Sequence, residues 1–295
     1  MRFKWLYFLI SLAVILPGLF SLISFGLKPS IDFTGGTLWE IEVNSEQPTV
    51  NSEDIKKIFE ESGLSAEVQT SGSDRLLIKT TSIDAPQKQS LAASMKNKLG
   101  DFTEVRFETL GPRLGTELLR KAAFAIFLAT LVILLYVAYR FKNLAYGATA
   151  ILAMFHDTLV LFGVFSLLGH FAGVEIGTLF VTAVLTTLSF SVHDTIVVFD
   201  RIREIRRNAN LDLEEAVDQA VGETMVRSLN NSLTIIFMLL TLFALGGETL
   251  KWFVFALLVG TVSGTYSSTF TAAPLLVVWH KLSVRHGWRG VLRLH

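Results

Sequence analysis

The sequence predicts a polytopic α-helical membrane protein with six transmembrane helices and a small extracytoplasmic α+β domain, of ferredoxin-like type, between helices 1 and 2. Its apolar residues gather in six long runs, and a hydrophilic stretch, residues 28–120, separates the first run from the others. Charged residues make up only 18% of the 295-residue chain, whereas soluble domains carry about 25%. Together these observations argue against a single soluble domain.

Each apolar run has the length of a membrane span. A helix needs about 20 apolar residues to cross a hydrocarbon core of roughly 30 Å. The first run, from Trp5 to Leu27, contains no charged residue. The others lie between Lys121 and Arg140, Lys142 and Glu175, Glu175 and Asp200, Arg227 and Glu248, and Lys251 and Lys281. Asp157 and Asp194 are the charged residues inside these runs.

The first run follows Arg2 and Lys4, which raises the alternative of a signal peptide. Its apolar stretch is longer than the roughly 7 to 15 residues of a signal-peptide core, and no clean small-residue cleavage site follows. We therefore expect an uncleaved first span. The expected organisation is residues 1–27 as the cytoplasmic N-terminus and helix 1, 28–120 as the outer domain, 121–280 as helices 2 to 6, and 281–295 as a cytoplasmic tail.

The distribution of basic residues predicts the orientation of the spans, because cytoplasmic loops carry an excess of Lys and Arg. With the N-terminus inside, the short outer loops hold only Lys251. The inner segments then hold Arg2, Lys4, Arg140, Lys142, Arg201, Arg203, Arg206, Arg207, Arg227, Lys281, Arg285, Arg289 and Arg293. Both termini are thus expected in the cytoplasm and residues 28–120 outside it.

The hydrophilic stretch has the pattern of an autonomous α+β unit. Strands are predicted at residues 38–43, 66–70, 76–80 and 103–109, and helices at residues 52–62 and 84–100. Asp84 with Gln87 three residues later is typical of a helix N-terminus. This β-α-β-β-α-β order is the split β-α-β, or ferredoxin-like, arrangement. The carboxylates of the unit are scattered and indicate a solvated face, so a binding or mechanical role is favoured over catalysis.

Asp194 is the strongest candidate for a functional residue. A charged side chain at the bilayer centre costs at least about 2.5 to 3.5 kcal/mol, so such a residue indicates function by default. Asp194 lies roughly 9 Å along a helix from Asp200 at the interface. Ser191 and Thr187 share its helical face. A carboxyl group flanked by hydroxyls can gain and lose a proton, and we expect Asp194 to do so.

The role of Asp157 is less decided. It lies about 21 Å along the helix from the cytoplasmic start of its span, and His156 beside it can be an ordinary core histidine. Transport and structural roles are therefore equally open for Asp157. His193 adjoins Asp194 but points about 100° away around the helix, which favours a role in packing.

The fifth and sixth spans supply polar and small residues that are expected to converge on Asp194. Arg227, Asn230, Asn231 and Thr234 recur at helical spacing and form one polar face. The sixth span carries small residues that permit close helix approach, namely Gly260, Ser263, Gly264, Ser267, Ser268 and Thr271. The predicted proton-transport residues are Asp194, Arg227, Asn230 and Asp157. The alternative is a structural Asp194–Arg227 pair, with small residues that only pack helices.

Composition excludes several functional classes. The chain has no cysteine, so it forms no disulfide or thiolate metal site. Its 26 basic and 26 acidic residues balance, and no basic block indicates a nucleic-acid partner. It has no phosphate-binding Gly-x-x-x-x-Gly-Lys loop. No cofactor or metal is predicted, an enzyme is the least favoured class, and an ion gradient, worth about 2.3 kcal/mol per charge per 100 mV, is the expected energy source.

Four motifs lie near the ends of the spans. They are Asp-Phe-Thr-Gly-Gly-Thr at 32–37, Gly-Pro-Arg-Leu-Gly at 111–115, Asp-Thr-Ile-Val-Val-Phe-Asp-Arg-Ile-Arg-Glu from Asp194, and Arg-Ser-Leu-Asn-Asn-Ser-Leu-Thr from Arg227. With them the chain resembles, over nearly its whole length, the SecF family of bacterial protein-export membrane subunits. The resemblance implies a relative of the resistance-nodulation-division transporters that forms a pseudosymmetric twelve-helix unit with SecD in the bacterial inner membrane.

The same resemblance implies a mechanism and residue roles. Proton flow through the SecD/SecF interface is expected to move the outer domains and to help a preprotein leave the SecYEG channel after SecA-driven translocation. Asp194 takes the proton-carrying position and Arg227 that of its partner arginine. Where many relatives have Asn before this aspartate, the chain has His193. The coupling ion is expected to be H⁺, with Na⁺, which some relatives use, as the alternative.

The boundaries and edges of the outer domain predict how it works. Gly35 and Gly36 at one boundary, and Gly111 and Pro112 at the other, are expected to act as hinges. The open edges of the sheet are expected to bind extended, unfolded chain. Two other functions remain open, a proton-coupled half-transporter for small hydrophobic solutes and a non-conducting membrane scaffold.

Overall fold

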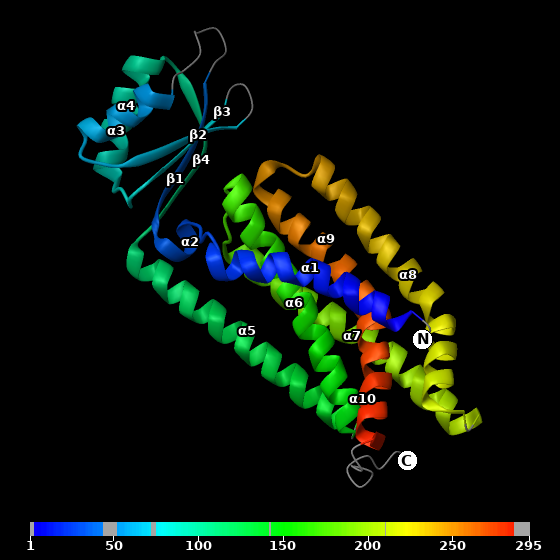
Figure 1. The fold of residues 1–295 in the computed structure, drawn as a ribbon. Helices are drawn as coiled ribbons and strands as arrows, with labels where there is room; N and C mark the ends of the chain where they lie inside the picture. Colours follow the sequence, from blue (N-terminus) through cyan, green and yellow to red (C-terminus); the bar gives the residue numbers. More distant parts are fainter. Residues whose placement is uncertain (1–2, 44–51, 72–74, 142, 210, 286–295) are drawn as a thin grey trace. The chain divides into compact units, whose positions relative to one another are not determined.

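The structure is a computed structural model that describes residues 3–43, 52–71, 75–141, 143–209 and 211–285 (Figure 1). The chain divides into two compact units. A helical unit comprises residues 1–28 and 124–295, and an α+β unit comprises residues 29–123. Among these described residues helices predominate, and the strands form one small antiparallel sheet.

Six helical segments in the described part of the chain are long and apolar enough to cross a membrane. They are α1 (Lys4–Ser24), α5 (Pro112–Phe141), α6 (Leu144–Ala172), α7 (Thr178–Ala209), α8 (Leu213–Leu245) and a sixth segment, Thr249–Ser283. The predicted set of six spans is confirmed. α7 ends after its apolar run and α8 begins before its own, so both helices are longer than the runs. Two acidic residues, Glu214 and Glu215, lie in the first turn of α8, where the positive end of the helix dipole stabilises them.

The sixth segment is not one continuous α-helix. α9 (Glu248–Ser267) passes through a π-helical turn, η1 (Ser268–Ala272), into α10 (Ala273–Arg285). Pro274 has no backbone N–H, and in a regular α-helix its ring collides with the carbonyl group four residues earlier. A wider π turn immediately before the proline relieves this conflict. The apolar run in the sequence predicts the span but not this change of helical pitch.

α6, α7 and the sixth segment supply most of the buried core of the helical unit, which includes Phe165 and Phe199. α1 packs on α6 through small residues. A Cβ atom added to Gly163 would lie 2.6 Å from the Cα of Gly18, and the hydroxyl groups of Ser21 and Ser166 share a 2.8 Å hydrogen bond. Small side chains therefore set the distance between these two helices, as is common in membranes.

Ion pairs join helix ends on one side of the helical unit. Arg140 of α5 pairs with Asp200 of α7 at 2.5 Å. Glu214, at the start of α8, pairs with both Lys4 of α1 and Lys281 of α10. Such partly exposed pairs contribute about 0 to 1 kcal/mol each. They therefore align the helix ends, while the buried apolar core supplies most of the stability.

The α+β unit contains a four-stranded antiparallel sheet in the order β2-β3-β1-β4. Its elements are α2 (Ile31–Thr34), β1 (Gly36–Val43), α3 (Ser52–Glu61), β2 (Ala66–Ser71), β3 (Arg75–Thr80), α4 (Ala85–Leu99) and β4 (Phe102–Leu110). Trp39 and Ile41 of β1 alternate into a core that α3 and α4 cover on one face of the sheet (Figure 1). The β-α-β-β-α-β order matches the sequence expectation, and the short α2 is an addition to it. β2 and β4 are the edge strands of this sheet.

The chain enters and leaves the sheet through a tight crossing of glycines. Gly35 has a φ of 74°, and a Cβ atom there would lie 2.7 Å from the Cα of Pro112. Gly36 has a φ of 133°, and a Cβ atom on Gly115 would lie 2.7 Å from the backbone nitrogen of Gly35. Gly111 differs, because a Cβ atom there would meet nothing within 4 Å. Close approach thus requires glycine at 35 and 115, while the hinge role of Gly35, Gly36, Gly111 and Pro112 stays a prediction.

We expect Gly35→Ala to destabilise the α+β unit more than Gly63→Ala does. Both glycines have a φ of +74°, so both substitutions carry a similar left-handed strain of about 1 to 2 kcal/mol. Only Gly35 also forces a collision with Pro112, whereas Gly63 faces open space, and overpacking adds about 1 to 3 kcal/mol. Hydrogen–deuterium exchange of β1 and β4 in the full chain measures the difference. Equal exchange in the two variants would contradict the close crossing.

Candidate functional site: two intramembrane carboxyl groups

Asp194 lies on the buried side of α7 and is 4% exposed. Its Oδ2 accepts a 2.8 Å hydrogen bond from the Oγ of Ser228 in α8. Ser228 belongs to a row of buried hydroxyl residues spaced by four positions, with Thr224 before it and Ser232 after it. These small side chains let α8 approach α7 closely enough for a hydroxyl group to reach the carboxyl group. Asp194 is therefore positioned by a hydrogen bond from an uncharged donor, the Ser228 hydroxyl, on a second helix.

The contact between Ser228 and Asp194 is compatible with two protonation states. A serine hydroxyl can donate a hydrogen bond to a carboxylate and can accept one from a carboxylic acid. Rotation of the Ser228 hydroxyl is the only change that the contact requires. Asp194 can therefore gain or lose a proton without losing its partner on α8.

Buried hydroxyl groups continue from Asp194 along α7. Ser191 and Thr187 are buried on the same face, as the sequence predicts. Within the described residues, neither Ser191 Oγ nor Thr187 Oγ1 has a hydrogen-bond partner. Glycines of α9 lie opposite: a Cβ atom on Gly260 would collide with the Thr187 side chain, and one on Gly264 would lie 3.4 Å from the Cα of Ser191. The small-residue face of α9 thus packs against the hydroxyl face of α7.

The polar face of α8 does not converge on Asp194 in this structure. Its members Arg227, Asn230, Asn231 and Thr234 are all exposed in this chain. Arg227 precedes Ser228 by one position and so points about 100° away around the helix. The expected contact of Arg227 with Asp194 is absent from the described residues, and Ser228 occupies its place. α8 buries its face of smaller side chains because that face permits the closer approach.

Asp157 is the second buried carboxyl group, 1% exposed on α6. Ser263 Oγ donates to its Oδ1 and Ser267 Oγ donates to its Oδ2, each at 2.6 Å. His156 Nδ1 lies 3.0 Å from Oδ1. Both oxygens of Asp157 therefore accept hydrogen bonds from serine hydroxyls of α9.

The two carboxyl groups occupy separate sites, since α8 holds Asp194 and α9 holds Asp157. Sequence reasoning treated Ser263 and Ser267 as packing residues and missed that they bind Asp157. Their four-residue spacing, which puts both hydroxyls on one helical face, is the signal that could have revealed a shared partner. His193 is exposed, in keeping with its predicted orientation away from Asp194.

Two family descriptions match the chain. The description "Protein export membrane protein SecD/SecF, C-terminal" matches residues 90–282, which contain both carboxyl groups. The description "SecD/SecF GG Motif" matches residues 20–46, which contain Gly35 and Gly36 of the tight crossing.

Individual relatives extend this likeness to most of the chain. A protein translocase subunit SecF from Thermobaculum terrenum is 44% identical, and the alignment covers 94% of this chain and 92% of that protein. A protein translocase subunit SecF from Anaerolinea thermophila is 39% identical with the same coverage. The crystal structure of SecDF, a translocon-associated membrane protein from Thermus thermophilus, matches with a TM-score of 0.82 at 33% identity, over 95% of this chain but 39% of the longer SecDF chain. Agreement in sequence and in fold over nearly the whole chain shows that it belongs to the SecF family of protein translocase subunits.

Proposed function

We propose that this chain is the SecF subunit of a bacterial Sec export machine. In the inner membrane it works with SecD and uses the proton gradient to promote preprotein translocation and release after SecA and SecYEG have acted. Asp194 is the observation that carries the proposal, because it is a buried carboxyl group on a membrane helix, held by a hydroxyl that tolerates both protonation states. The SecF name of its relatives supports the export role, which is transport rather than chemical catalysis.

Proton transfer needs a route to Asp194 as well as an acceptor. The hydroxyl groups of Ser191 and Thr187 are buried without partners in the described residues, and each can donate and accept a hydrogen bond. They extend the polar surface from Asp194 along α7 toward Gly260 of α9. This row supports a path for H⁺, the coupling ion that we propose, with Na⁺ as the alternative.

The exposed polar face of α8 supports SecD as the partner. Arg227 and Asn230 are exposed in the isolated chain, and Asn230 lies inside the fifth apolar run, where a polar side chain that faces lipid is costly. Polar side chains within membrane helices almost always face protein or a water-filled cavity. SecD therefore covers this face in the proposed complex, and protons pass along the interface between the two subunits.

Coupling follows from a change in the distance between Arg227 and Asp194. A cation within about 4 to 6 Å favours the charged form of a carboxyl group, and desolvation without the cation favours the neutral form. In the present conformation Ser228, not Arg227, contacts Asp194. A rotation or shift of α8 relative to α7 would replace Ser228 with Arg227 as the neighbour of Asp194. Each proton passage thus accompanies a helix movement.

The α+β unit supplies the mechanical part of the proposal. By the asymmetry of basic residues it lies outside the cytoplasm, while both termini lie inside. Its edge strands β2 and β4 offer unpaired backbone groups to an extended preprotein segment. At the crossing of Gly35 and Pro112, the segment that enters the sheet contacts the segment that leaves it. A movement of α5 would therefore rotate the sheet about this crossing.

Asp194→Asn should abolish gradient-stimulated preprotein release and leave SecA-dependent translocation intact. Asparagine keeps the size of the side chain but cannot ionise. Proton flux and preprotein release are measured in vesicles that carry equal amounts of unaltered or variant protein together with SecD. Repeating the assay with a sodium gradient identifies the coupling ion.

Asp157→Asn is the matched comparison for Asp194→Asn. It changes another buried carboxyl group, which accepts hydrogen bonds from both Ser263 and Ser267. We therefore expect Asp157→Asn to lower the stability of the protein more than Asp194→Asn does, and to lower the proton flux less. Unchanged flux in Asp194→Asn would remove this residue from the mechanism and favour the non-conducting scaffold. Flux that drives efflux of a small apolar solute, without any effect on preprotein release, would favour the half-transporter.

Arg227→Lys should retain part of the gradient-stimulated release, and Arg227→Gln should retain almost none. Lysine keeps the charge but replaces the planar fork of the guanidinium group with a point charge, whereas glutamine has no charge to offer Asp194. Because Arg227 is exposed in this chain, neither variant should lower the thermal stability of the isolated subunit. Equal release by both variants would show that the charge is not used.

A photoreactive side chain at Glu67 of β2 or Val105 of β4 should capture a translocating preprotein. Both positions are exposed on edge strands of the sheet. Lys57 is an exposed control position on a helix, α3, rather than on a strand. Arrested export intermediates, analysed for crosslinked preprotein, provide the measurement. Capture at Lys57 alone, or at none of the three positions, would argue against binding at the sheet edges.

A further inference from the structure

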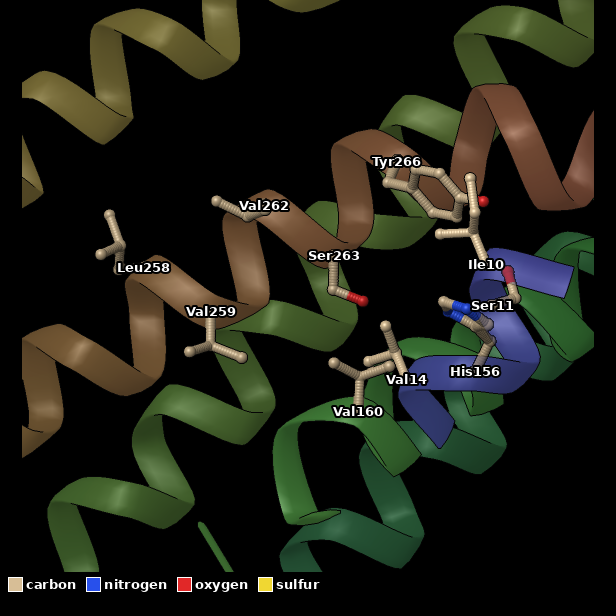
Figure 2. Close-up of a pocket in the computed structure, with 10 residues that line it drawn as sticks. All are labelled: Ile10, Ser11, Val14, His156, Val160, Leu258, Val259, Val262, Ser263 and Tyr266. Atoms are coloured by element: carbon tan, nitrogen blue, oxygen red, sulfur yellow. The ribbon is translucent and has the colours of Figure 1, made fainter. Parts of the chain in front are cut away.

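The helical unit has two features that the proposed export function does not use. One is a cavity of about 350 Å³ between α1, α6 and α9 (Figure 2). Its wall is mostly aliphatic, and no Asp, Glu, Lys or Arg is among the described residues that line it, so it offers no charge that could select a ligand. The other feature is a group of arginines where the ends of α5 and α7 meet the start of α6.

A buried aromatic pair supports these arginines. Phe141, the last residue of α5, stacks on Tyr146 of α6 with the ring centroids 5.8 Å apart. Phe199 of α7 meets both rings edge-on, so the pair is fixed by the core. Two guanidinium groups lie over the Phe141 ring, with Cζ of Arg140 at 5.9 Å and Cζ of Arg203 at 6.0 Å from its centroid. Arginines from two helices thus gather at one rigid platform.

Two arginines of this group lack an acidic partner. Arg203 and Arg206 are three positions apart, so they share one face of α7, and both are half-buried. Arg206 also interacts with the hydroxyl group of Tyr146. Arg140 and Arg201 each form ion pairs with acidic residues. Within the described residues, Arg203 and Arg206 form none. Two neighbouring like charges repel each other, and an anion that contacts both relieves this repulsion.

The depth of these arginines in the bilayer suits a lipid headgroup. Tyr136 and Tyr139 are exposed in the last turns of α5, and exposed tyrosines near the end of a span mark the level of the headgroups. Phe141 follows Tyr139 by two positions, about 3 Å along the helix, and Arg203 lies over its ring. By the asymmetry of basic residues, this end of α5 is predicted to face the cytoplasm, where basic sites between membrane helices bind anionic lipids.

We propose that Arg203 and Arg206 bind the phosphate group of an anionic lipid. Each guanidinium group presents a planar fork of N–H donors that matches phosphate oxygens, and two forks on one helix face can share one phosphate. Exposed apolar side chains of α5, among them Leu131 and Leu135, offer a surface to the acyl chains. Arg203 lies nine positions, roughly 13 Å, along α7 from Asp194. The lipid therefore links α5 to α7 outside the proposed proton path, and the site is independent of the export function.

The test uses photoactivatable phosphatidylglycerol with the full chain, alone and assembled with SecD, in nanodiscs of phosphatidylcholine. The probe should label peptides of α5 or α7 in a saturable manner. Unlabelled phosphatidylglycerol should compete, whereas phosphatidylcholine, which has no net charge, and inorganic phosphate at matched ionic strength, which has no acyl chains, should not. Competition by inorganic phosphate would assign the arginines to a free anion and overturn the proposal. Loss of labelling on assembly with SecD would also overturn it, because a protein surface would then cover the arginines.

Substitutions distinguish this site from general attraction to the membrane surface. Arg203→Gln and Arg206→Gln should each weaken competition by phosphatidylglycerol about fivefold, which corresponds to about 1 kcal/mol for one basic residue near the surface. Arg203→Lys keeps the charge but not the planar fork, so it should lose less. Arg201→Gln is the matched control, because it removes the same charge from α7 but Arg201 points about 160° away from Arg203. This control should change the competition less than twofold.

The two glutamine variants of Arg201 and Arg203 decide the question. Weakening confined to Arg203→Gln and Arg206→Gln would support a specific phosphate site. Equal weakening by Arg201→Gln and Arg203→Gln would show that only the net charge of α7 attracts the lipid, and would refute the site.

Discussion

Hydrocarbon offers no hydrogen bonds, and this constraint orders the polar residues of the helical unit. Asp194 and Asp157 each lie where a neighbouring helix presents serine hydroxyls. Ser21 and Ser166 pair with each other between α1 and α6. In each case a polar group on one membrane helix is satisfied by a small polar group on another. Helix register in this unit is therefore set by polar pairs, and apolar side chains fill the space between them.

Small residues make these pairs possible. A serine side chain is short, so its oxygen reaches a partner only when the two backbones come close. Glycines at helix contacts permit that distance, as Gly18 and Gly163 do between α1 and α6 and Gly260 does against Thr187. The same contacts leave little room for larger side chains. Small residues at the helix contacts thus produce both the polar pairs and the close packing.

The number of donors distinguishes the two carboxyl groups. Asp157 receives hydrogen bonds on both oxygens from two serines, with His156 at its side. Asp194 has one hydroxyl partner, and the hydroxyl groups of Ser191 and Thr187 farther along its helix face are without partners in the described residues. A group that changes its protonation state needs nearby hydroxyl groups that can still form new hydrogen bonds. This difference supports our proposal that Asp194 carries the proton, while the role of Asp157 in proton transport stays a prediction.

The sequence by itself determined the six spans, the β-α-β-β-α-β order of the α+β unit and the two buried carboxyl groups, because each follows from local periodicity or from the cost of a charge in hydrocarbon. Only the tertiary structure decided which face of α8 meets α7. Arg227 and Ser228 are adjacent, and their spacing patterns are equally regular. Close packing selects the smaller face, so Ser228 contacts Asp194 and Arg227 stays exposed. The serine partners of Asp157 were likewise decided by helix packing, since they depend on which residues distant in sequence become neighbours.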